Sequence, residues 1–591
     1  MPSATDRMTA GPLVRGLTKL WTGQGVEVLP NEDLVTRVLR ARGLTDPDAR
    51  ARFLEPSLRH LHDPSGIPDM DRAAARVLHA ARTGEPIVLY GDYDVDGVTS
   101  VAILHHVLRL LEPGAVISSY VPHRLEEGYG LNAQAIRDLA ARGAKVIVSV
   151  DCGVTAVEPA RVARDAGVDL IITDHHNPPA TMGELPDAYA VVHPRRPDSV
   201  YPFGDLCGAG VAFKLAWRLA TMHCGGERVP PPVRELLLEL LALAALGVIA
   251  DVVPLRDENR VIARFGLARI KHSGLGGLRA LVEASGLSGE NVREDDVGFT
   301  LAPRLNACGR MGHAREAVEL LTVAEGDRAR EIAEGLTRLN NERRATEREI
   351  FRRACELAEQ GGMTGSERRA IVLADPAWHA GVVGIVCSRL VERYHRPAIL
   401  LCEADGACHG SGRSIDGFSL HAALAECAAH LTGYGGHDMA AGMRLSRANL
   451  DAFAEAFVGV ANRQIDAAHL VARGNFDTDA GLHEFSLDTA RRLGLLGPFG
   501  RENPPVRLRV RGVRVATLPE TFGPQNKHLS LRVTPDAGGA PVRLVGWNWG
   551  ARAKDIPRGS LLDVFVTPRI NEFNGRRSVE CDLHDLLHAG A

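Results

Sequence analysis

The residues of this chain that could do chemistry are carboxylates and imidazoles placed directly after apolar segments. The first segment, VLYGDYDVDG, sets Asp92, Asp94 and Asp96 at alternate positions after a hydrophobic run. Three more segments repeat the pattern, VIVSVDCG, LIITDHH and LGVIADVVP, and they add Asp151, Asp174, His175, His176 and Asp251. Like charges this close repel, and each carboxylate resists ionising beside the others, so a bound cation is needed to hold them together.

Carboxylates and imidazoles without sulfur suit Mn²⁺ or Mg²⁺. A pair of such ions activates water and stabilises both oxygens of an in-line phosphoryl displacement. Each residue alone has a simpler explanation, since a strand-end Asp is more often a helix N-cap and a His pair is usually surface or core packing. A calcium loop does not explain the alternate aspartates, because position 12 counted from Asp92 is Ile103 rather than Glu. The four segments together favour a two-metal site.

The elements that must position these residues are strands of an α/β fold. We expect strands at 87–90, 145–150 and 169–173, separated by amphipathic helices, and a buried helix at 240–250 that ends at Asp251. Continuous apolar strands separated by helices imply a parallel sheet covered on both faces. Ligands of such sheets bind beyond the carboxyl ends of the strands, so the acidic residues should meet in one crevice.

The 591 residues are too many for one hydrophobic core, and we expect about three or four domains. A helix of about 30 residues should begin at an N-cap on Asp327 and stop at Gly361-Gly362, and a helix that long often bridges domains. The expected organisation is an N-terminal helical lead-in at 1–75, an α/β core at 76–325, the long connecting helix at 326–365, a second α/β domain at 366–468 and a strand-rich domain at 469–591.

Composition narrows the classes of protein. The net charge of -4 gives no global attraction to nucleic acid, so any such binding must come from local basic patches. No basic, apolar signal segment opens the sequence, and no apolar stretch is long enough for a membrane span. The 10 cysteines are scattered without a CxxC pair, which disfavours a zinc ribbon. We expect reduced thiols, a cytoplasmic location and no membrane contact.

The motifs DYDVDG, VDCG, TDHH and ADVVPL resemble, in order, the four motifs of the DHH phosphoesterase superfamily. From about residue 75 to the end the chain resembles the RecJ family, bacterial single-strand-specific 5′→3′ DNA exonucleases of that superfamily. The stretches that carry this likeness are PHRLEEGYGL, LCGAGVAFKL, APRLNACGRMGHA, WHAGVVGIVCSRL, GSGRSIDGFSL and YGGHDMAAG.

The resemblance implies roles for particular positions. Those that correspond to family metal ligands are Asp94, Asp96, Asp151, His175 and Asp251. His176 would sit beside the scissile phosphate, while Asp92 and Asp174 would lie near the ligands, with Asp174 orienting an imidazole. Groups that correspond to the 5′-phosphate site are Arg124, Ser411 and Arg413. Asn306 and Arg310 resemble residues that line the DNA path.

The resemblance also implies an OB-fold at the C-terminus, single-stranded DNA as substrate, and a single-strand-binding protein and a RecQ-type helicase as partners of a monomer. Two positions depart from the family pattern. Glu502 stands in PFGRENPP where a glycine is expected, which leaves the local turn open, and Cys308 replaces a small alanine.

Three later segments have the chemistry of nucleic-acid contacts. GSGRS combines backbone N–H groups, the Ser411 hydroxyl and the Arg413 guanidinium as an anion cradle, although a plain Gly-rich turn is the alternative. His437 in YGGHDMAAG could touch a phosphate or could simply support a tight turn. VRLRVRGVRV places Arg507, Arg509 and Arg511 on one face of a strand, with a bulge or bend at Gly512, which suits tracking of a DNA backbone. Candidate stacking groups are Phe522, His528, Trp547, Trp549 and Phe573, of which two or three should belong to the core.

Three functions remain open from the residues. The leading hypothesis is a metal-dependent exonuclease that degrades single-stranded DNA to mononucleotides in recombination and repair. A small DHH phosphodiesterase or pyrophosphatase is the second, but such chains typically lack an Arg-faced C-terminal β domain. An inactive DHH scaffold of a replication complex is the third, and it should have lost ligands, whereas all the carboxylates and both histidines are present.

Overall fold

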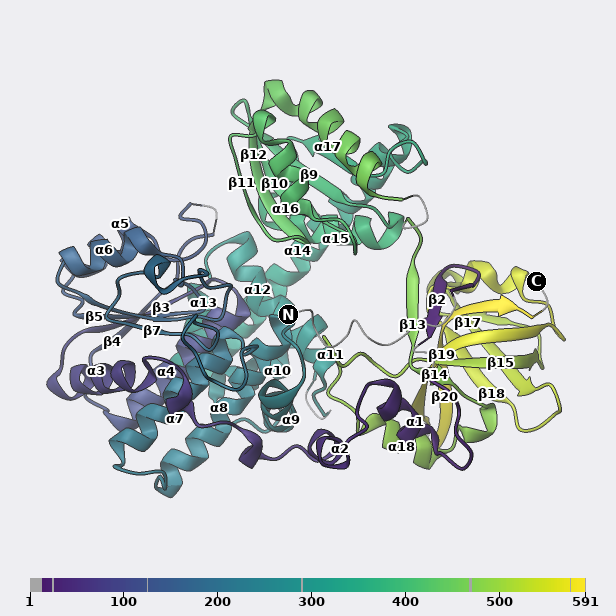
Figure 1. Ribbon diagram of the computed structural model, residues 1–591, viewed down its shortest axis with the longest axis horizontal. Coiled ribbons are helices and arrows are strands. Elements are labelled where there is room, and N and C mark those ends of the chain that lie inside the picture. The colour runs from purple at the N-terminus through teal and green to yellow at the C-terminus, as the bar shows by residue number, and fades with distance from the viewer. Residues whose placement is uncertain are drawn as a thin grey trace.

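The computed structural model describes residues 13–23, 26–124, 126–287, 291–466, 470–573 and 575–589. Figure 1 shows an α/β core on the left, a smaller α/β domain above it and a β-barrel domain on the right. No helix among the described residues has the length and apolarity that a membrane span requires. All ten cysteines are free thiols, as predicted.

The core is built on one parallel sheet buried on both faces, which confirms the prediction. Its strands are β3 (Ile87–Gly91), β4 (Ile117–Tyr120), β5 (Val146–Val150), β6 (Asp169–Thr173) and β7 (Ala190–Val192). Ile87 and Leu89 of β3 pack on one side with helices α3 (Met70–Thr83), α4 (Val95–Leu111) and α7 (Gly208–His223). Val88 and Tyr90 pack on the other side with α5 (Ala133–Ala141) and α6 (Val157–Asp165). Successive side chains of a strand point to opposite faces, so a wholly apolar strand needs both layers.

The strand order β4-β3-β5-β6-β7 fixes where a ligand can bind. From β3 the chain runs first to β4 on one side and later to β5 on the other side of β3. This reversal opens a crevice at the carboxyl ends of β3 and β5, where sheets of this topology bind their ligands. The first two acidic segments leave the sheet at this point.

A helical layer completes the core and leads into the long helix. Its elements are α8 (Pro231–Ala250), α9 (Asp257–Ile270), α10 (Gly276–Ala284), α11 (Glu294–Asp296), the π-helical turn η5 (Val297–Leu301), α12 (Ala302–Met311) and α13 (Arg315–Thr322). The stretch 240–248 of α8 is buried, so the apolar run there is a core helix, as predicted.

The long helix α14 (Gly326–Gln360) has 35 residues, or about 50 Å. Ile332 and Leu336 pack in the core, whereas Ile350 and Ala354 pack in the second α/β domain, so α14 bridges the two domains. The predicted stop at Gly361 is confirmed, but the predicted N-cap is wrong. Glu325 occupies the cap position, and Asp327 lies in the first turn, where its charge suits the helix dipole.

The second α/β domain has a mixed sheet in the order β11-β12-β10-β9-β8, in which only β8 and β9 are parallel. Its elements are β8 (Ile371–Asp375), α15 (Ala380–Tyr394), β9 (Ala398–Ala404), β10 (Ala407–Arg413), α16 (Leu420–Glu426), β11 (Gly433–Gly436), β12 (Ala440–Ser446) and α17 (Leu450–Gln464). The domain lies above the core in Figure 1, joined to it through α14.

The last domain is a small closed β-barrel. Its strands are β14 (Thr478–Asp479), β15 (Leu508–Val515), β16 (Glu520–Phe522), β17 (His528–Pro535), β18 (Val542–Gly546), β19 (Leu561–Phe573) and β20 (Arg576–His588). The order β15-β19-β20-β18-β17 closes through a β15–β17 pairing, and five strands closed in this way make an OB-fold. The register shifts between Val510 and Val513, which confirms the predicted bulge at Gly512.

The N-terminal segment is not only helical. Alongside α1 (Leu34–Ala41) and α2 (Pro47–Leu54) it contains strands β1 (Val14–Arg15) and β2 (Leu20–Gly23), which were not predicted from the sequence. β2 pairs in parallel with β13 (Arg473–Phe476), and Trp21 Nε1 donates a hydrogen bond of 2.8 Å to the buried Asp585. Strand β2 therefore packs against the last domain, as the purple strand beside the yellow barrel shows in Figure 1.

Short connecting elements fill the remaining turns. They are the helical turns η2 (Leu58–His60), η3 (Pro64–Gly66), η4 (Met182–Glu184), η6 (Ala428–His430), η7 (Arg447–Asn449), η9 (Leu482–Glu484), η10 (Pro524–Asn526) and η11 (Gly550–Asp555), and the helix α18 (Leu487–Gly494) before the barrel.

Candidate active site

The four acidic segments converge at the carboxyl edge of the core sheet. His175 Nε2 lies 3.1 Å from Asp151 Oδ1, 3.6 Å from Asp251 Oδ2 and 3.7 Å from Asp96 Oδ2. Side chains that offer oxygen or nitrogen atoms within 4.8 Å of one another form three overlapping groups: Asp92, Asp94 and Asp151; Asp96, His175 and Asp251; and Asp151, Asp174, His175 and His176. All seven residues predicted to be catalytic thus lie in one cluster.

Close backbone packing holds the cluster together. A Cβ atom at Gly97 would lie 2.5 Å from the Asp92 carbonyl oxygen, and one at Gly208 would lie 2.6 Å from the Asp151 Cβ. Both positions therefore require glycine. Asp151 itself has a φ of 62°, in the left-handed region that aspartate and asparagine tolerate better than most residues.

Two of the aspartates cap helices as well as joining the cluster. Asp94 Oδ1 accepts hydrogen bonds from the N–H groups of Asp96 and Gly97 at 2.8 and 3.2 Å, at the start of α4. The Asp96 carboxylate accepts from the N–H groups of Gly208 and Ala209 at 2.6 and 2.8 Å, at the start of α7. Both carboxylates are therefore oriented by backbone before any ligand arrives.

Several buried atoms of the cluster lack a partner. Asp92 Oδ1, Asp151 Oδ1 and His175 Nε2 are buried and make no hydrogen bond within the described residues. A buried polar atom without a partner is costly, and native proteins seldom leave one unless a ligand fills the gap. Two carboxylate oxygens and an imidazole nitrogen are ligands that Mn²⁺ and Mg²⁺ accept, so the residues present fit a metal centre.

The pKa values of the residues in the cluster also favour the binding of a metal ion. Burial raises the pKa of Asp92, Asp96 and Asp151 above the ordinary range, and neighbouring carboxylates raise it further. Burial and the charges of Asp96 and Asp94 raise the pKa of Asp251 to about 8. Burial lowers the pKa of His175 to about 4, so its imidazole is neutral and can offer a lone pair. A divalent cation would replace the protons that these carboxyl groups otherwise retain.

His176 has the opposite protonation. Burial opposes its charged form, but a 2.8 Å hydrogen bond from Nδ1 to Asp174 Oδ1 and the charge of that carboxylate raise the pKa of His176 to about 9. Asp174 is itself fixed by N–H groups, including that of Val154 at 2.9 Å. The Tyr129 hydroxyl lies 3.0 Å from His176 Nε2 and 3.2 Å from the Asp151 carbonyl oxygen. Tyr129 was not among the predicted site residues, although it lies within the motif PHRLEEGYGL.

A cleft of about 810 Å³ opens beside the cluster. The core lines it with His175, His176 and Asp251, the second α/β domain with residues 436–439, which include His437, and the turn before the barrel with Arg501 and Glu502. His437 therefore faces the same cleft as the cluster. Arg501 was not among the predicted site residues, although it lies within the segment PFGRENPP.

The backbone conformation at Glu502 explains why the family pattern has a glycine at this position. Its φ is 59°, a backbone conformation that glycine adopts freely and that costs other residues roughly 1–2 kcal/mol. An ion pair of 3.2 Å with Arg256 holds the glutamate there. The turn thus keeps the conformation of a glycine turn despite the substitution. Cys308, the other departure, is buried and its thiol donates to the Leu305 carbonyl oxygen at 2.8 Å.

A group of arginines lies beside the Asp92–Asp94 side of the cluster. Burial, and then the charges of Arg124, Arg343 and Arg413, lower the pKa of Arg310 to about 10. The Arg124 guanidinium lies 4.8 Å from the centre of the Tyr93 ring. Within the described parts of the chain, none of Arg124, Arg310 and Arg413 has a carboxylate within ion-pair distance. Clustered guanidinium groups that form no ion pair are suited to binding an anion, such as a phosphate.

The GSGRS segment is a strand and not a loop cradle. Ser411 and Arg413 lie on β10, whose backbone pairs with β9 on one side and β12 on the other. Its backbone N–H groups are committed to these ladders, so the expectation of a backbone anion cradle is wrong. The side chains stay available, because Gly384 of α15 leaves room beside them: its Cβ would lie 3.3 Å from Arg413 Nη2 and 3.4 Å from Ser411 Oγ.

Asn306 and Arg310, predicted to line the DNA path, lie on α12 between these groups. Asn306 Oδ1 accepts a hydrogen bond of 3.1 Å from the Val95 N–H, so it also braces the loop that carries the first aspartates. Arg310 Nη1 donates to the Gly381 carbonyl oxygen at 3.3 Å, at the start of α15. Both residues therefore lie where the core meets the second α/β domain.

The arginines of strand β15 in the barrel are less available to bind DNA than the sequence predicts. Val506, Leu508 and Val510 are buried as predicted, with the arginines on the other face. Arg509 and Arg511, however, both bind Asp479, at 2.5 and 2.8 Å. This single carboxylate therefore offsets only part of the positive charge of that face.

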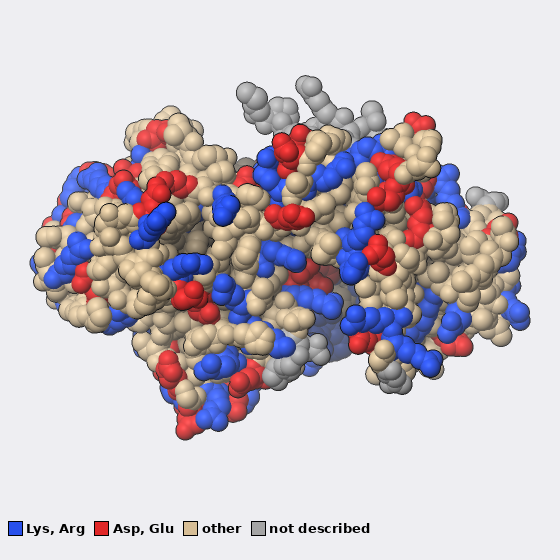
Figure 2. Space-filling view, turned by 90° about the horizontal axis from the view of Figure 1, so that it is seen from below, with Lys and Arg blue, Asp and Glu red and all other residues tan. Residues whose placement is uncertain are grey.

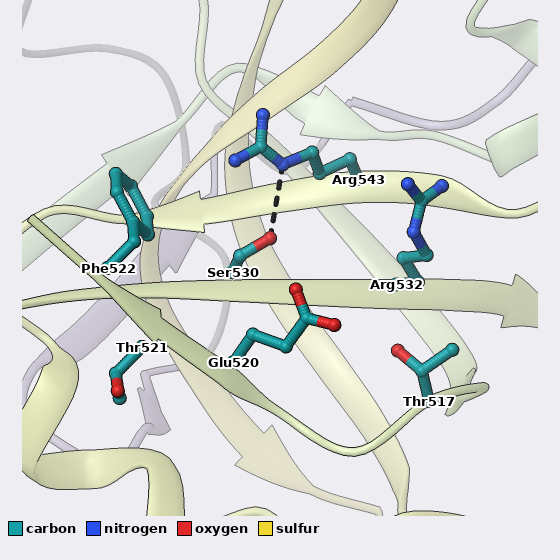
Figure 3. A pocket seen from close by; sticks show the side chains of 7 residues that line it. All are labelled: Thr517, Glu520, Thr521, Phe522, Ser530, Arg532 and Arg543. Carbon is teal, nitrogen blue, oxygen red and sulfur yellow. Dashed lines mark hydrogen bonds between the residues drawn. The ribbon is translucent and has the colours of Figure 1, made fainter. Parts of the chain in front are cut away.

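A shallow pocket of about 300 Å³ lies instead on strands β16, β17 and β18. Figure 3 shows Phe522 at one end, Arg532 at the other and the Glu520 carboxylate between them. Arg543 Nε donates to Ser530 Oγ at 3.1 Å at the pocket wall. The rings of Phe522, His528 and Trp547 pack together with centroids 4.9 to 6.0 Å apart. Of the other stacking candidates, Trp549 packs against the barrel core and Phe573 is exposed.

Comparison with known families assigns the chain to a class. Residues 86–245 match the DHH family, N-terminal domain, residues 367–462 match the DHHA1 domain and residues 476–585 match the RecJ OB domain. Fold and site together define a DHH phosphoesterase. The single-stranded-DNA-specific exonuclease RecJ of Escherichia coli (strain K12) is 33% identical, over 94% of this chain and 95% of its own. The chain belongs to the RecJ family.

Other relatives agree with this assignment. The exonuclease of the same name from Bacillus subtilis (strain 168) is 38% identical, over 93% of this chain and 67% of its own length. A crystal structure of RecJ in complex with Mn²⁺ from Thermus thermophilus matches with a TM-score of 0.78 at 32% identity, over 94% of this chain and 76% of that one. A complex with Mg²⁺ from the same organism matches with a TM-score of 0.72.

Proposed function

We propose that this chain is an exonuclease that needs Mn²⁺ or Mg²⁺ and degrades single-stranded DNA from its 5′ end to mononucleotides, in recombination and repair. The observation that carries the proposal is the buried cluster in which atoms of Asp92, Asp151 and His175 make no hydrogen bond, next to arginines that form no ion pair among the described residues. Relatives named as single-stranded-DNA-specific exonucleases, over most of this chain, support it.

In this proposal two cations are held by Asp94, Asp96, Asp151, His175 and Asp251, with Asp92 beside them. When bound, the cations supply a nucleophilic water and stabilise the oxygens of the phosphate under attack. The orphaned atoms, and the Mn²⁺ and Mg²⁺ complexes of the Thermus relative, support the assignment.

His176 acts on the substrate directly. Its raised pKa keeps the imidazole protonated at neutral pH, and Asp174 orients the ring from Nδ1. The protonated ring donates a hydrogen bond to the scissile phosphate, where the developing negative charge strengthens it. Tyr129 limits rotation of the ring through its contact with Nε2.

Arg124, Ser411 and Arg413, with Arg310 behind them, receive the terminal 5′ phosphate. A guanidinium pairs with phosphate oxygens through two N–H groups, and a hydroxyl adds a third donor. A terminal-phosphate site beside the metal cluster selects one end of the strand and so sets the 5′→3′ direction. None of these arginines forms an ion pair with a carboxylate among the described residues, which supports this role.

The path of the strand runs through the cleft between the core, the second α/β domain and the turn before the barrel. His437 lines this cleft, and we place Asn306 and Arg310 on the same path because they lie where the core meets the second α/β domain. Figure 2 shows the lower face hollowed between the core and the barrel, with Lys and Arg side chains gathered around the hollow. A single strand is thin and flexible enough to follow such a path, and a duplex is not.

The barrel grips the strand, and two surfaces are candidates. Arg507, Arg509 and Arg511 are one, weakened by Asp479. The pocket on β16–β18 with Phe522 and Arg532 is the other, and it lies on the strands with which OB-folds commonly bind oligonucleotides. We favour the second surface, because it combines the aromatic ring of Phe522 with Arg532, which forms no ion pair among the described residues.

Further parts of the proposal rest on the sequence pattern and, for the oligomeric state and the partners, on family likeness. They are the domain limits 76–325, 326–365, 366–468 and 469–591, a cytoplasmic location, a monomeric state, and a single-strand-binding protein and a RecQ-type helicase as partners. Co-purification of the tagged full chain with these two proteins, in extracts treated with nuclease, tests the partners.

Digestion of single strands labelled at either end tests the activity. In Mn²⁺ the 5′ label should appear at once in mononucleotides, whereas the 3′ label should stay in long fragments until the end. Asp151→Asn is the matched control, since asparagine tolerates the φ of 62° at this position, and it should remove nearly all cleavage. Cleavage in EDTA, or early release of the 3′ label, would refute the proposal.

A further inference from the structure

A cation from the turn before the barrel lies in the active-site cleft. Arg501 lines the cleft together with His175, His176 and Asp251, although it belongs to a segment 250 residues later in the chain. Its carbonyl oxygen accepts a hydrogen bond of 2.9 Å from the Leu255 N–H, just after Asp251. The turn is therefore fastened to the core beside the cluster.

Two further contacts fix the turn. Glu502 is held in its left-handed conformation by the ion pair with Arg256. The Phe499 N–H donates to Glu294 Oε1 at 2.8 Å. Strained backbone that is held by several contacts is common at binding sites, because it keeps a side chain aimed at a ligand.

Arg501 differs from the other arginines of the cleft because its guanidinium has no hydrogen-bond or ion-pair partner among the described residues. Arg256 pairs with Asp205 at 2.6 Å as well as with Glu502. Arg195 donates to the His175 carbonyl oxygen at 2.6 Å. For Arg501, no carboxylate within the described ranges lies at ion-pair distance, and its charge is felt at Asp251, where it opposes the burial that raises that pKa.

The two ends of the cluster face different cations. Arg124 lies over the ring of Tyr93, between Asp92 and Asp94, at the end where the terminal phosphate is received. Arg501 lines the cleft with Asp251 at the other end, and the chain continues from it into the barrel. A strand laid from the arginine group across the cluster and on to the barrel passes Arg501 after the scissile phosphate.

We propose that Arg501 binds the backbone phosphate that follows the scissile one on its 3′ side, and so holds the strand in register for cleavage. This inference rests on the proposed function. The unpaired guanidinium, its fixed turn and its place in the cleft carry it. A phosphodiester shares one negative charge between two oxygens, and a guanidinium can bind both of them through two N–H groups.

A methylphosphonate, which removes the charge of one linkage, tests the contact. We would measure binding of 5′-phosphorylated oligothymidylates in Ca²⁺ and their single-turnover cleavage in Mn²⁺ by the full chain and by Arg501→Gln. Arg501→Gln should weaken binding and slow cleavage about tenfold. A methylphosphonate at the linkage after the scissile one should cost the parent about tenfold and the variant very little.

Three controls separate a contact from a structural effect. Arg491→Gln removes an exposed arginine of α18 that pairs with Asp488 outside the cleft, and it should behave as the parent. Arg501→Lys should regain part of the loss, and a methylphosphonate placed far along the strand should affect parent and variant equally. If the methylphosphonate next to the scissile linkage costs the variant as much as the parent, the inference is wrong. If the parent binds DNA without cleaving it, the proposed function fails, while the loss of methylphosphonate sensitivity in binding would still support Arg501.

Discussion

Replacing Asp251 with asparagine should stabilise the metal-free protein at neutral pH and reduce its response to Mn²⁺. In the folded chain the pKa of this carboxyl group is about 8, against 3.8 for an ordinary aspartate. Below pH 4 the group is protonated in both states and has no effect on stability. Between pH 4 and 8 the unfolded chain ionises and the folded chain does not, so the free energy of unfolding falls as the pH rises.

The size of the effect follows from the same two values. One pH unit corresponds to about 1.4 kcal/mol, and pH 7 lies about three units above the ordinary pKa, which gives an upper limit of about 4 kcal/mol. Because the Asp251 side chain is 27% exposed, we expect a gain nearer about 2 kcal/mol for Asp251→Asn at pH 7. The gain should vanish near pH 4.

Urea unfolding of the chain after EDTA treatment, from pH 4 to 8, measures this. The parent should lose stability with rising pH more steeply than Asp251→Asn, and Mn²⁺ should restore the parent far more than the variant. Asp205→Asn removes a carboxylate from the same cleft but outside the cluster, so it should keep the response of the parent to Mn²⁺. Equal pH slopes in parent and Asp251→Asn, or equal stabilisation of both by Mn²⁺, would refute the reasoning.

Three other predictions concern the DNA. Arg413→Ala should abolish the preference for 5′-phosphorylated over 5′-hydroxyl strands, whereas Arg447→Ala, which removes an arginine paired with Glu403, should not; competition between the two strands measures this. Blunt duplex should resist digestion and a 5′ single-stranded tail should restore it, so equal rates would contradict a narrow path. Arg532→Glu should flatten the slope of log affinity against log salt by about 0.7 for each lost phosphate contact. Arg511→Glu should change that slope less, because Asp479 already pairs with this arginine.

Local patterns in the sequence predicted the core and the metal-binding cluster. Strands such as Ile87–Gly91 are continuous apolar runs, and the polarity changes abruptly where each one ends. Since parallel strands end at one edge of a sheet, the residues that follow them must meet there. The long helix was equally visible from its periodicity, although its first residue was misplaced, because an aspartate suits both the cap and the first turn.

Contacts between distant segments could not be predicted from local patterns in the sequence. Strand β2 is stabilised by Asp585 and by β13, more than 400 residues away, and nothing near Trp21 indicates this. The same is true of Arg501, whose role depends on the docking of its turn against Leu255. The periodicity of the sequence predicted that Arg509 and Arg511 lie on one face of their strand. It could not predict that Asp479 of the neighbouring strand pairs with both of them.

The strand-end aspartates show that helix capping and metal binding do not exclude each other. From the sequence, a helix N-cap and a ligand compete as explanations of Asp94 and Asp96, yet both residues cap helices and both lie in the cluster. An ionised carboxylate offers about four lone pairs, so two N–H groups leave acceptor capacity for a cation. Capping also fixes the side-chain torsions, so less conformational entropy is lost when a cation binds. The backbone contacts that make each aspartate look structural are therefore what prepares it as a ligand.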